Sequence, residues 1–153
     1  MLNHTLDRYQ EERQPAILTR AGELLSLVTD GKYSKVLIDE ESLRQQKKRV
    51  SVINPRGKQF KSDHLSQGTK EQLYLCLRIA YAESFAAQSK VLPLIFDDIL
   101  VNFDLQRAGK TIKAIVDSSS SRQIIAFTCH RHIKDLFLAE NKEIKVFELT
   151  DSH

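Results

Sequence analysis

From residue 91 onward, short apolar runs alternate with segments of helical pattern, and this alternation limits the folds open to the chain. The run VLPLIF is continuously apolar, which is typical of a strand covered on both faces. Beyond it we expect a helix at 105–117, a buried strand at 123–128, a helix at 131–140 and a last strand at 144–149. The alternation predicts an α/β fold with a largely parallel sheet.

The preceding part of the chain is predicted to be helical and then β-rich. An N-terminal helix is expected to be interrupted or restarted at Pro15 and to end at a cap formed by Asp30 and Gly31. Two strands at 33–39 and 50–52 and a turn at Asn54-Pro55-Arg56-Gly57 should follow, with Phe60 on the returning strand. A helix from about 69 to 88 is apolar nearly all round, Phe85 included, so we expect it to be buried.

Length and composition favour one globular domain. The chain has 153 residues, 41% hydrophobic and 28% charged, which excludes a wholly disordered or fibrous protein. No apolar run approaches ~18 residues, so no transmembrane helix is expected. The polar N-terminus has no apolar signal core. Cys76 and Cys129 do not make a disulfide framework, so we expect a cytoplasmic protein.

The segment LSQGTKEQ, at 65–72, lies just before the long helix. Ser66 and Gly68 fall where the unpaired amides of a helix N-terminus make a phosphate-binding position. The alternative is a plain serine cap with a loop glycine, and the local sequence alone favours that alternative.

Two carboxylates end the apolar run in LPLIFDD. In α/β proteins, ligands bind outside the carboxyl ends of the strands. Asp97 is placed to hold Mg²⁺, and Asp98 is placed to orient and deprotonate a water molecule. An acidic cap on the next segment is the alternative, but carboxylates at the end of an otherwise apolar strand favour a functional site.

Two further residues belong to this pattern. Asp104, in ILVNFD, is by itself expected to be the N-cap of the next helix. His130 follows the strand IIAFT, so it should share a sheet edge with Asp97 and could sense phosphate there. The run Cys129-His130-Arg131-His132 has no second ligand pair at zinc spacing, so we do not predict a metal there.

Taken in order, these segments resemble the C-terminal half of an SMC-like ATPase head. LSQGTKEQ resembles an ABC-type signature motif, LPLIFDD a Walker B strand, the aspartate of VNFD a D-loop, and FTCH a switch-histidine strand. SMC-like proteins include RecN, RecF and SbcC, and the likeness is greatest to YhaN-like bacterial ATPases. The resemblance covers about residues 16–150 and implies a P-loop NTPase-type fold.

The resemblance implies a role for each matching residue in binding ATP and Mg²⁺. Ser66, Gln67 and Gly68 would belong to the nucleotide-contacting set, with Ser66 and Gly68 touching the γ-phosphate held by a facing head. Asp97 would support Mg²⁺, and Asp98 would take the position of the catalytic carboxylate, which is usually Glu. Asp104 would cross the dimer seam, and His130 would sense the γ-phosphate.

The chain contains no phosphate loop of the form G-x-x-x-x-G-K-[ST]. Gly109-Lys110-Thr111 imitates its end, but Asp104 stands where its first glycine is required. In SMC-like heads this loop lies in an N-terminal lobe beyond a long coiled coil. The resemblance therefore implies that 1–14 is a coiled-coil stump and 15–153 a C-terminal lobe, inactive until an N-terminal lobe with Walker A joins it and ATP pairs the heads.

A basic stretch without Asp or Glu runs from 42 to 62. Its seven cations are Arg44, Lys47, Lys48, Arg49, Arg56, Lys58 and Lys61. They could contact a DNA backbone through 44–61, or form a solvated hairpin, and both interpretations stay open. Two rivals to the ATPase lobe follow: a non-catalytic interaction module that keeps the fold, and a small basic nucleic-acid-binding domain.

Overall fold

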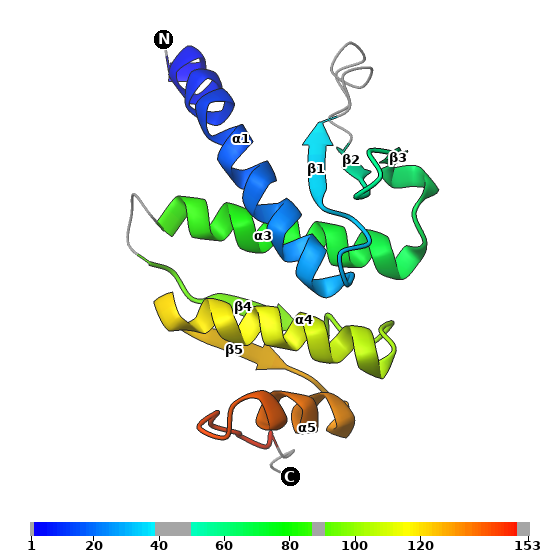
Figure 1. The fold of residues 1–153 in the computed structure, drawn as a ribbon. Coiled ribbons are helices and arrows are strands. Elements are labelled where there is room, and N and C mark those ends of the chain that lie inside the picture. The colour runs from blue at the N-terminus through cyan, green and yellow to red at the C-terminus, as the bar shows by residue number, and fades with distance from the viewer. Residues whose placement is uncertain (1, 39–49, 87–90, 150–153) are drawn as a thin grey trace.

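The computed structural model describes residues 2–38, 50–86 and 91–149, and only the backbone of 2–13 and 121. The elements are α1 (Leu2–Val28), β1 (Lys35–Ile38), β2 (Val50–Ile53), β3 (Gln59–Lys61), η1 (Ser62–His64), α3 (Gln67–Ala86), β4 (Leu94–Asp97), α4 (Leu105–Ser118), η2 (Ser119–Ser121), β5 (Ile124–Phe127) and α5 (Arg131–Glu140). Figure 1 shows α1, α3 and β1–β3 on one side of the β4–β5 pair and α5 on the other. No helix in these described ranges is long and apolar enough to cross a membrane.

Helix α1 continues through Pro15, so the predicted interruption is wrong. Proline removes only its own backbone donor, and the surrounding turns keep theirs. Pro15 is also exposed, where a lost hydrogen bond can be replaced by water. The carbonyl of Pro15 accepts a hydrogen bond from Thr19 Oγ1 at 2.9 Å. The helix then ends beside Asp30 and Gly31, which adopt φ values of 54° and 71°, as the predicted cap requires.

The β-rich region forms an antiparallel sheet in the order β1-β2-β3. Val52 pairs with Val36 on one side and with Phe60 on the other, so Phe60 lies on the returning strand as predicted. The Asn54–Gly57 turn is closed by a 2.9 Å hydrogen bond from Gly57 N to Asn54 O. Gly57 has a φ of 79°, which favours glycine.

Helix α3 is buried on one side only, which corrects the expectation of a fully buried helix. Its buried side chains include Gln72, Leu73 and Ile79. Tyr74, Tyr81 and Phe85 are exposed. Helix α1 packs along α3, and the apolar surface that it leaves uncovered faces outward. Helix α3 therefore carries more apolar surface than the neighbouring elements cover.

Strands β4 and β5 are parallel, and they pair Ile95 with Ile125 and Asp97 with Phe127. The predicted strand at 144–149 does not form within the described residues. A strand needs a neighbour to complete its hydrogen-bond ladder, and this segment instead approaches α5, where Lys134 Nζ lies 3.5 Å from Glu148 Oε1. The parallel sheet of the described chain therefore has two strands.

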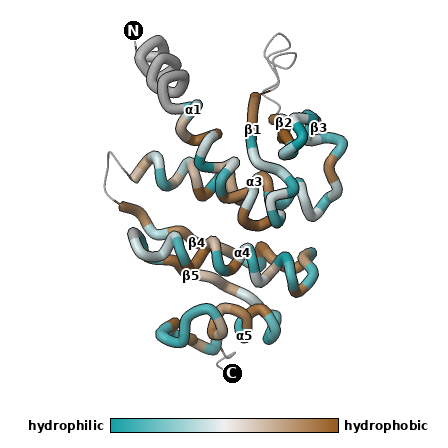
Figure 2. Tube along the Cα trace, in the orientation of Figure 1, coloured by the Kyte–Doolittle hydropathy of each residue, from teal (hydrophilic) through white to brown (hydrophobic). Residues whose placement is uncertain are grey.

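The β4–β5 pair is covered on one face, and the prediction of cover on both faces is wrong. Phe96 is buried in the main core with Ile115 of α4 and Leu73 of α3. Ile95, which points the opposite way, is 64% exposed, and Phe127 is 47% exposed. Val91 and Leu92 in the segment leading into β4 are also exposed. Figure 2 shows this segment as strongly hydrophobic. Among the residues that the structure describes, no layer covers this apolar sheet face.

Helix α4 lies between the two apolar clusters of the molecule. Ala114 and Ile115 belong to the main core shared with α1 and α3. Ala108 and Ile112 belong to a second cluster, which includes Ile133 of α5. Because α4 contacts both clusters, it holds α5 in place relative to the rest of the fold.

Candidate functional site

The residues singled out in the sequence lie on one side of the molecule. Strands β4 and β5 run in the same direction and end there, and α3, α4 and α5 begin there (right in Figure 1). Asp98 N donates a 3.0 Å hydrogen bond to Phe127 O, so the pairing of the two strands extends to Asp98. This edge places Asp97, Asp98 and His130 together, where ligands of α/β proteins bind.

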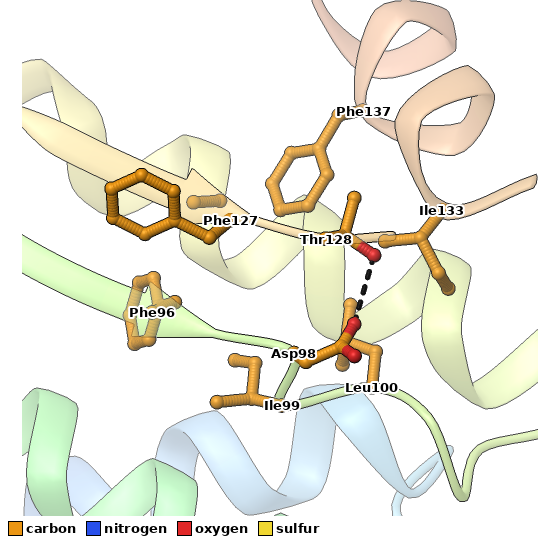
Figure 3. Close-up of a pocket in the computed structure, with 9 residues that line it drawn as sticks. Phe96, Asp98, Ile99, Leu100, Phe127, Thr128, Ile133 and Phe137 are labelled. Atoms are coloured by element: carbon orange, nitrogen blue, oxygen red, sulfur yellow. Dashed lines mark hydrogen bonds between the residues drawn. The ribbon is translucent and has the colours of Figure 1, made fainter. Parts of the chain in front are cut away.

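Asp98 has an unusual backbone conformation, and two neighbouring side chains hold its carboxylate. Its φ is 50°, in the left-handed region that few residues other than glycine adopt. Thr128 Oγ1 donates a hydrogen bond to Asp98 Oδ1 at 3.0 Å (Figure 3). Cys129 Sγ donates to Asp98 Oδ2 at 3.4 Å. Strained residues held by their surroundings concentrate at functional sites, so the conformation marks Asp98 as a candidate.

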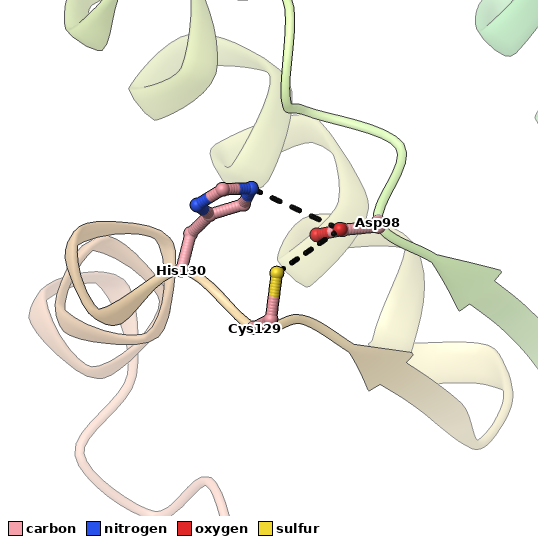
Figure 4. Close-up of side chains that lie close together, drawn as sticks. All are labelled: Asp98, Cys129 and His130. Carbon is pink, nitrogen blue, oxygen red and sulfur yellow. Dashed lines mark hydrogen bonds and ion pairs between the residues drawn. The ribbon is translucent and has the colours of Figure 1, made fainter.

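His130 completes this group. Its Nε2 lies 3.8 Å from Asp98 Oδ2, and each side chain is 36% exposed (Figure 4). The backbone N of His130 donates to Thr128 Oγ1 at 3.1 Å, which fixes the turn from β5 into α5. A protonated imidazole would form an ion pair with the carboxylate, and a neutral one could share a proton with a ligand placed between them.

Asp97 occupies the last position of β4 and is exposed. It points to the same face as Ile95, opposite to Phe96, because side chains alternate along a strand. Magnesium is usually held by one or two carboxylates together with substrate phosphates, and an exposed carboxylate at a sheet edge fits that donor set. The residues present therefore suit Mg²⁺ bound with a nucleotide.

A small cavity lies beneath Asp98, but it does not hold a ligand. Its walls are mostly apolar and include Phe96, Leu100, Ile133 and Phe137 (Figure 3). Its volume is about 10 Å³, on the order of the space for one water molecule. A ligand larger than a water molecule therefore does not fit inside this cavity.

The start of α3 forms a second group. Ser66 precedes α3, and its carbonyl accepts a 2.9 Å hydrogen bond from Lys70 N. Its Oγ lies 2.8 Å from Thr69 Oγ1 and 3.4 Å from Thr69 N, so Ser66 occupies the cap position. Gln67 Nε2 donates to Glu71 Oε1 at 2.9 Å. Both Ser66 and Gln67 are exposed, so capping leaves them accessible from outside the molecule.

Asp104 and Gly68 are brought together by a residue that the sequence analysis did not single out. Asp104 caps α4, as predicted, by accepting a 2.9 Å hydrogen bond from Arg107 N. Arg107 Nε lies 3.2 Å from Asp104 Oδ2. A Cβ atom at Gly68 would come within 2.8 Å of Arg107 Nη1, so the glycine leaves room for this guanidinium. Arg107 follows its cap residue by three positions, a spacing that could have indicated it.

The two cysteines have different environments. Cys76 is buried in α3, and burial raises the pKa of its thiol to about 12. Cys129 is exposed, and its pKa is raised mainly because its thiol donates a hydrogen bond to the Asp98 carboxylate. The sequence analysis missed Cys129 and Thr128 as partners of Asp98, although both immediately precede His130.

The sequence of the chain is similar to part of a longer bacterial protein. No protein-family model matches the sequence. The chain is 36% identical over 138 residues to the uncharacterized protein YhaN of Bacillus subtilis (strain 168). The match covers 90% of this chain but 14% of the length of YhaN, so the chain corresponds to one segment of that relative.

Solved structures with a similar fold are SMC head domains. One, described in a study of the ATP-driven dimerization and DNA-stimulated activation of SMC ATPases, has a TM-score of 0.72 at 17% identity, over 96% of this chain and 84% of that one. The SMC head with coiled coil and joint from Pyrococcus yayanosii has a TM-score of 0.65 at 16% identity, over 90% of this chain and 25% of that one. The chain therefore has the α/β fold of an SMC ATPase head and is similar in sequence to one segment of YhaN.

Proposed function

We propose that this chain is the C-terminal lobe of an SMC-like ATPase head, which binds and hydrolyses ATP after a lobe carrying Walker A completes it. One observation supports this more than any other. Asp98 and His130 approach to 3.8 Å at the carboxyl edge of a parallel strand pair. That edge adjoins a sheet face whose Ile95 and Phe127 are exposed.

In the proposed chemistry, three residues at this edge have separate roles, and Thr128 supports one of them. Asp97 would hold Mg²⁺, which neutralises charge on the phosphates when it is bound. Asp98 would orient the attacking water and accept its proton, and Thr128 would keep the carboxylate in place for this. His130 would donate a hydrogen bond to the γ-phosphate. Positioning and electrostatic stabilisation are the main contributions to phosphoryl transfer, so fixed side chains matter more here than basicity.

The start of α3 would contact the nucleotide of a facing head. Ser66 and Gln67 are exposed, and the N-terminus of a helix favours anions. Gly68 and Asp104 would lie at the same seam, joined by Arg107, whose charge also suits a phosphate. We therefore assign these residues to ATP-dependent pairing of two heads and the Asp98 edge to hydrolysis.

The missing half of the site would come from an N-terminal lobe. The glycine-rich loop and lysine that surround the β- and γ-phosphates are absent from this sequence. The open face of β4–β5 is where such a lobe could bury apolar surface. In this proposal residues 1–14 end a returning coiled coil and 15–153 form the lobe.

We further propose a link to DNA handling or repair through the basic β2–β3 turn. Arg44, Lys47, Lys48 and Arg49 lie outside the described residues, and the described part of the basic stretch includes the β2–β3 turn. Arg56 and Lys58 are exposed there. Exposed cations on a hairpin suit a phosphate backbone.

The proposal is tested by head pairing in the assembled protein. With a Walker A lobe and ATP, Asp98→Asn should trap paired heads, because it nearly preserves shape while it removes the base and its charge. Ser66→Arg should spare nucleotide binding and prevent pairing. Ser120→Arg, on the η2 turn, is the matched control and should pair normally. Sedimentation velocity measures the paired fraction, and ATP-dependent pairing that survives Ser66→Arg would contradict the assignment of the seam.

A further inference from the structure

Three potential metal ligands of different chemistry converge at the end of β5. Asp98 Oδ2 lies 3.4 Å from Cys129 Sγ. It lies 3.8 Å from His130 Nε2. The carboxylate, thiol and imidazole atoms are all within 4.8 Å of one another (Figure 4). A carboxylate, a thiolate and an imidazole are the three side-chain types that bind Zn²⁺ in proteins.

Two of the three separations are close to those around a tetrahedral ion, and the third, between sulfur and nitrogen, is within 4.8 Å and is adjusted by rotation of the imidazole. Zinc–sulfur bonds of about 2.3 Å and zinc–oxygen or zinc–nitrogen bonds of about 2.0–2.1 Å place tetrahedral S···O pairs about 3.6 Å apart and N···O pairs about 3.3 Å apart. The observed 3.4 Å for sulfur and oxygen is already close to the first value. The 3.8 Å between nitrogen and oxygen has to shorten by about half an ångström, which a rotation of the exposed imidazole can supply.

We propose that Asp98, Cys129 and His130 bind a thiophilic divalent cation, of which Zn²⁺ is the best fit. The sequence analysis predicted no metal at 129–132 because it lacked a second pair of ligands at zinc spacing. The fold supplies a third ligand from Asp98, which lies 31 residues before Cys129. Three protein ligands leave the fourth tetrahedral position to water.

This site differs in chemistry from the magnesium position proposed at Asp97. Mg²⁺ prefers oxygen ligands in octahedral geometry and binds thiols and imidazoles poorly. A thiolate and an imidazole favour Zn²⁺ and similar ions. The local support is also suitable for a metal site, because Thr128 orients the Asp98 carboxylate by a 3.0 Å hydrogen bond.

The consequence for activity depends on the proposed function. If Asp98 and His130 act on ATP, a bound zinc ion occupies both of them. Zinc and hydrolysis would then exclude one another, and zinc would inhibit the assembled ATPase. Zinc binding itself needs no nucleotide, so it can be measured separately from the proposed function.

The test is a titration of the 153-residue chain, reduced and without nucleotide, with Co²⁺ and then with Zn²⁺. We expect one Co²⁺ per chain, with the near-ultraviolet charge-transfer band of a cobalt–thiolate bond, and displacement of Co²⁺ by Zn²⁺. Cys129→Ser should remove the band. Asp98→Asn and His130→Gln should each weaken Zn²⁺ binding by about tenfold or more.

The matched control is His64→Gln, an exposed histidine on η1, which should leave zinc affinity unchanged. Circular dichroism checks that each variant is folded. Absence of the thiolate band in the folded wild-type chain would overturn the proposal. Equal zinc affinity in wild type and in all three ligand variants would overturn it as well. Neither result would contradict the ATPase assignment, whose test is head pairing.

Discussion

The helix pair α1–α3 and the strand pair β4–β5 are both rich in apolar residues, but they bury them to different extents. In the helix pair, Leu25 and Leu73 are fully buried, and both belong to the main core. In the strand pair, Phe96 is buried, whereas its neighbour Ile95 is 64% exposed. The helix pair thus completes its own packing on the side where the two helices meet, and the strand pair completes only one face.

The two regions therefore differ in role: the buried surface of the helix pair stabilises the fold, and the exposed face of the strand pair is open to a partner. Apolar surface that is already buried stabilises the chain, and apolar surface that stays exposed in an ordered sheet indicates a binding partner. The candidate site residues lie at the end of the strand pair, beside the open face. The part of the fold that is incomplete is therefore also the part that carries Asp97, Asp98 and His130.

The largest effect is expected from a substitution in the core of the α1–α3 helix pair. Leu73→Ala should lower the free energy of unfolding by about 2–5 kcal/mol, because it leaves a cavity in the core. Ile95→Ala removes a side chain of similar size from the open face and should change the stability by about 0.5 kcal/mol or less. Urea unfolding measures both. Equal losses for the two variants would show that the open face is packed in solution.

A smaller effect is expected from the ion pair that links α1 to α3. Arg20 Nε lies 2.7 Å from Glu83 Oε2, and Glu83 is the more buried partner. The pKa of Arg20 is raised, chiefly by its hydrogen bond to Glu83. Glu83→Gln should cost about 1 kcal/mol, a modest value because the Arg20 side chain is 41% exposed. Glu23→Gln, at the more exposed partner of Arg20, should cost less in the same unfolding experiment.

The thiols of the two cysteines, one in the helix pair and one at the end of the strand pair, should react differently as the pH changes. Cys76, with a pKa of about 12, should not react with iodoacetamide in the folded chain at neutral pH. Cys129 should react, and its rate should rise with pH as thiolate forms. Asp98 raises the pKa of Cys129, so Asp98→Asn should lower that pKa and shift the rate profile to lower pH. Mass spectrometry of the alkylated peptides reports both sites, and an unshifted Cys129 profile would contradict the contact.

The smallest effect is expected at the β2–β3 turn. If Arg56 and Lys58 contact duplex DNA in the assembled head, reversing both to Glu should reduce affinity and lower the salt-dependence slope by about two. Lys113→Glu, at an exposed position of α4, is the control and should leave the slope unchanged. Fluorescence anisotropy across a salt series measures the slope. Unchanged binding in the double variant would assign these cations to a solvated surface.

Much of the fold could be predicted from local patterns, because its signals are short in range. The helix at 131–140 coincides with α5, and Asp104 caps α4 as its position before that helix indicated. Pro15 and the 144–149 segment could not be predicted in the same way. Propensity does not say whether a helix tolerates a proline, and apolar alternation does not say whether a strand finds a neighbour to pair with.

The candidate site could be predicted in part. The ends of two apolar strands indicated that Asp97 and His130 share an edge, since parallel strands meet at the same side of a sheet. The contact between Cys129 and Asp98 depends on strand register and on the left-handed backbone of Asp98. Neither is encoded in a short motif. Cover on both faces of β4 was predicted from the continuous apolar run VLPLIF, and such a run does not show which segment supplies the cover.

In the proposed function, this chain supplies the carboxylate half of an ATPase site, and its sequence contains no phosphate loop. The most direct measurement is steady-state, Mg²⁺-dependent ATP hydrolysis by the chain alone, by a Walker A lobe alone and by the two together. We predict negligible turnover for each part, activity for the pair, and loss of that activity in a chain carrying both Asp97→Ala and Asp98→Asn. Hydrolysis by the chain alone, or by the pair carrying both substitutions, would contradict the claim.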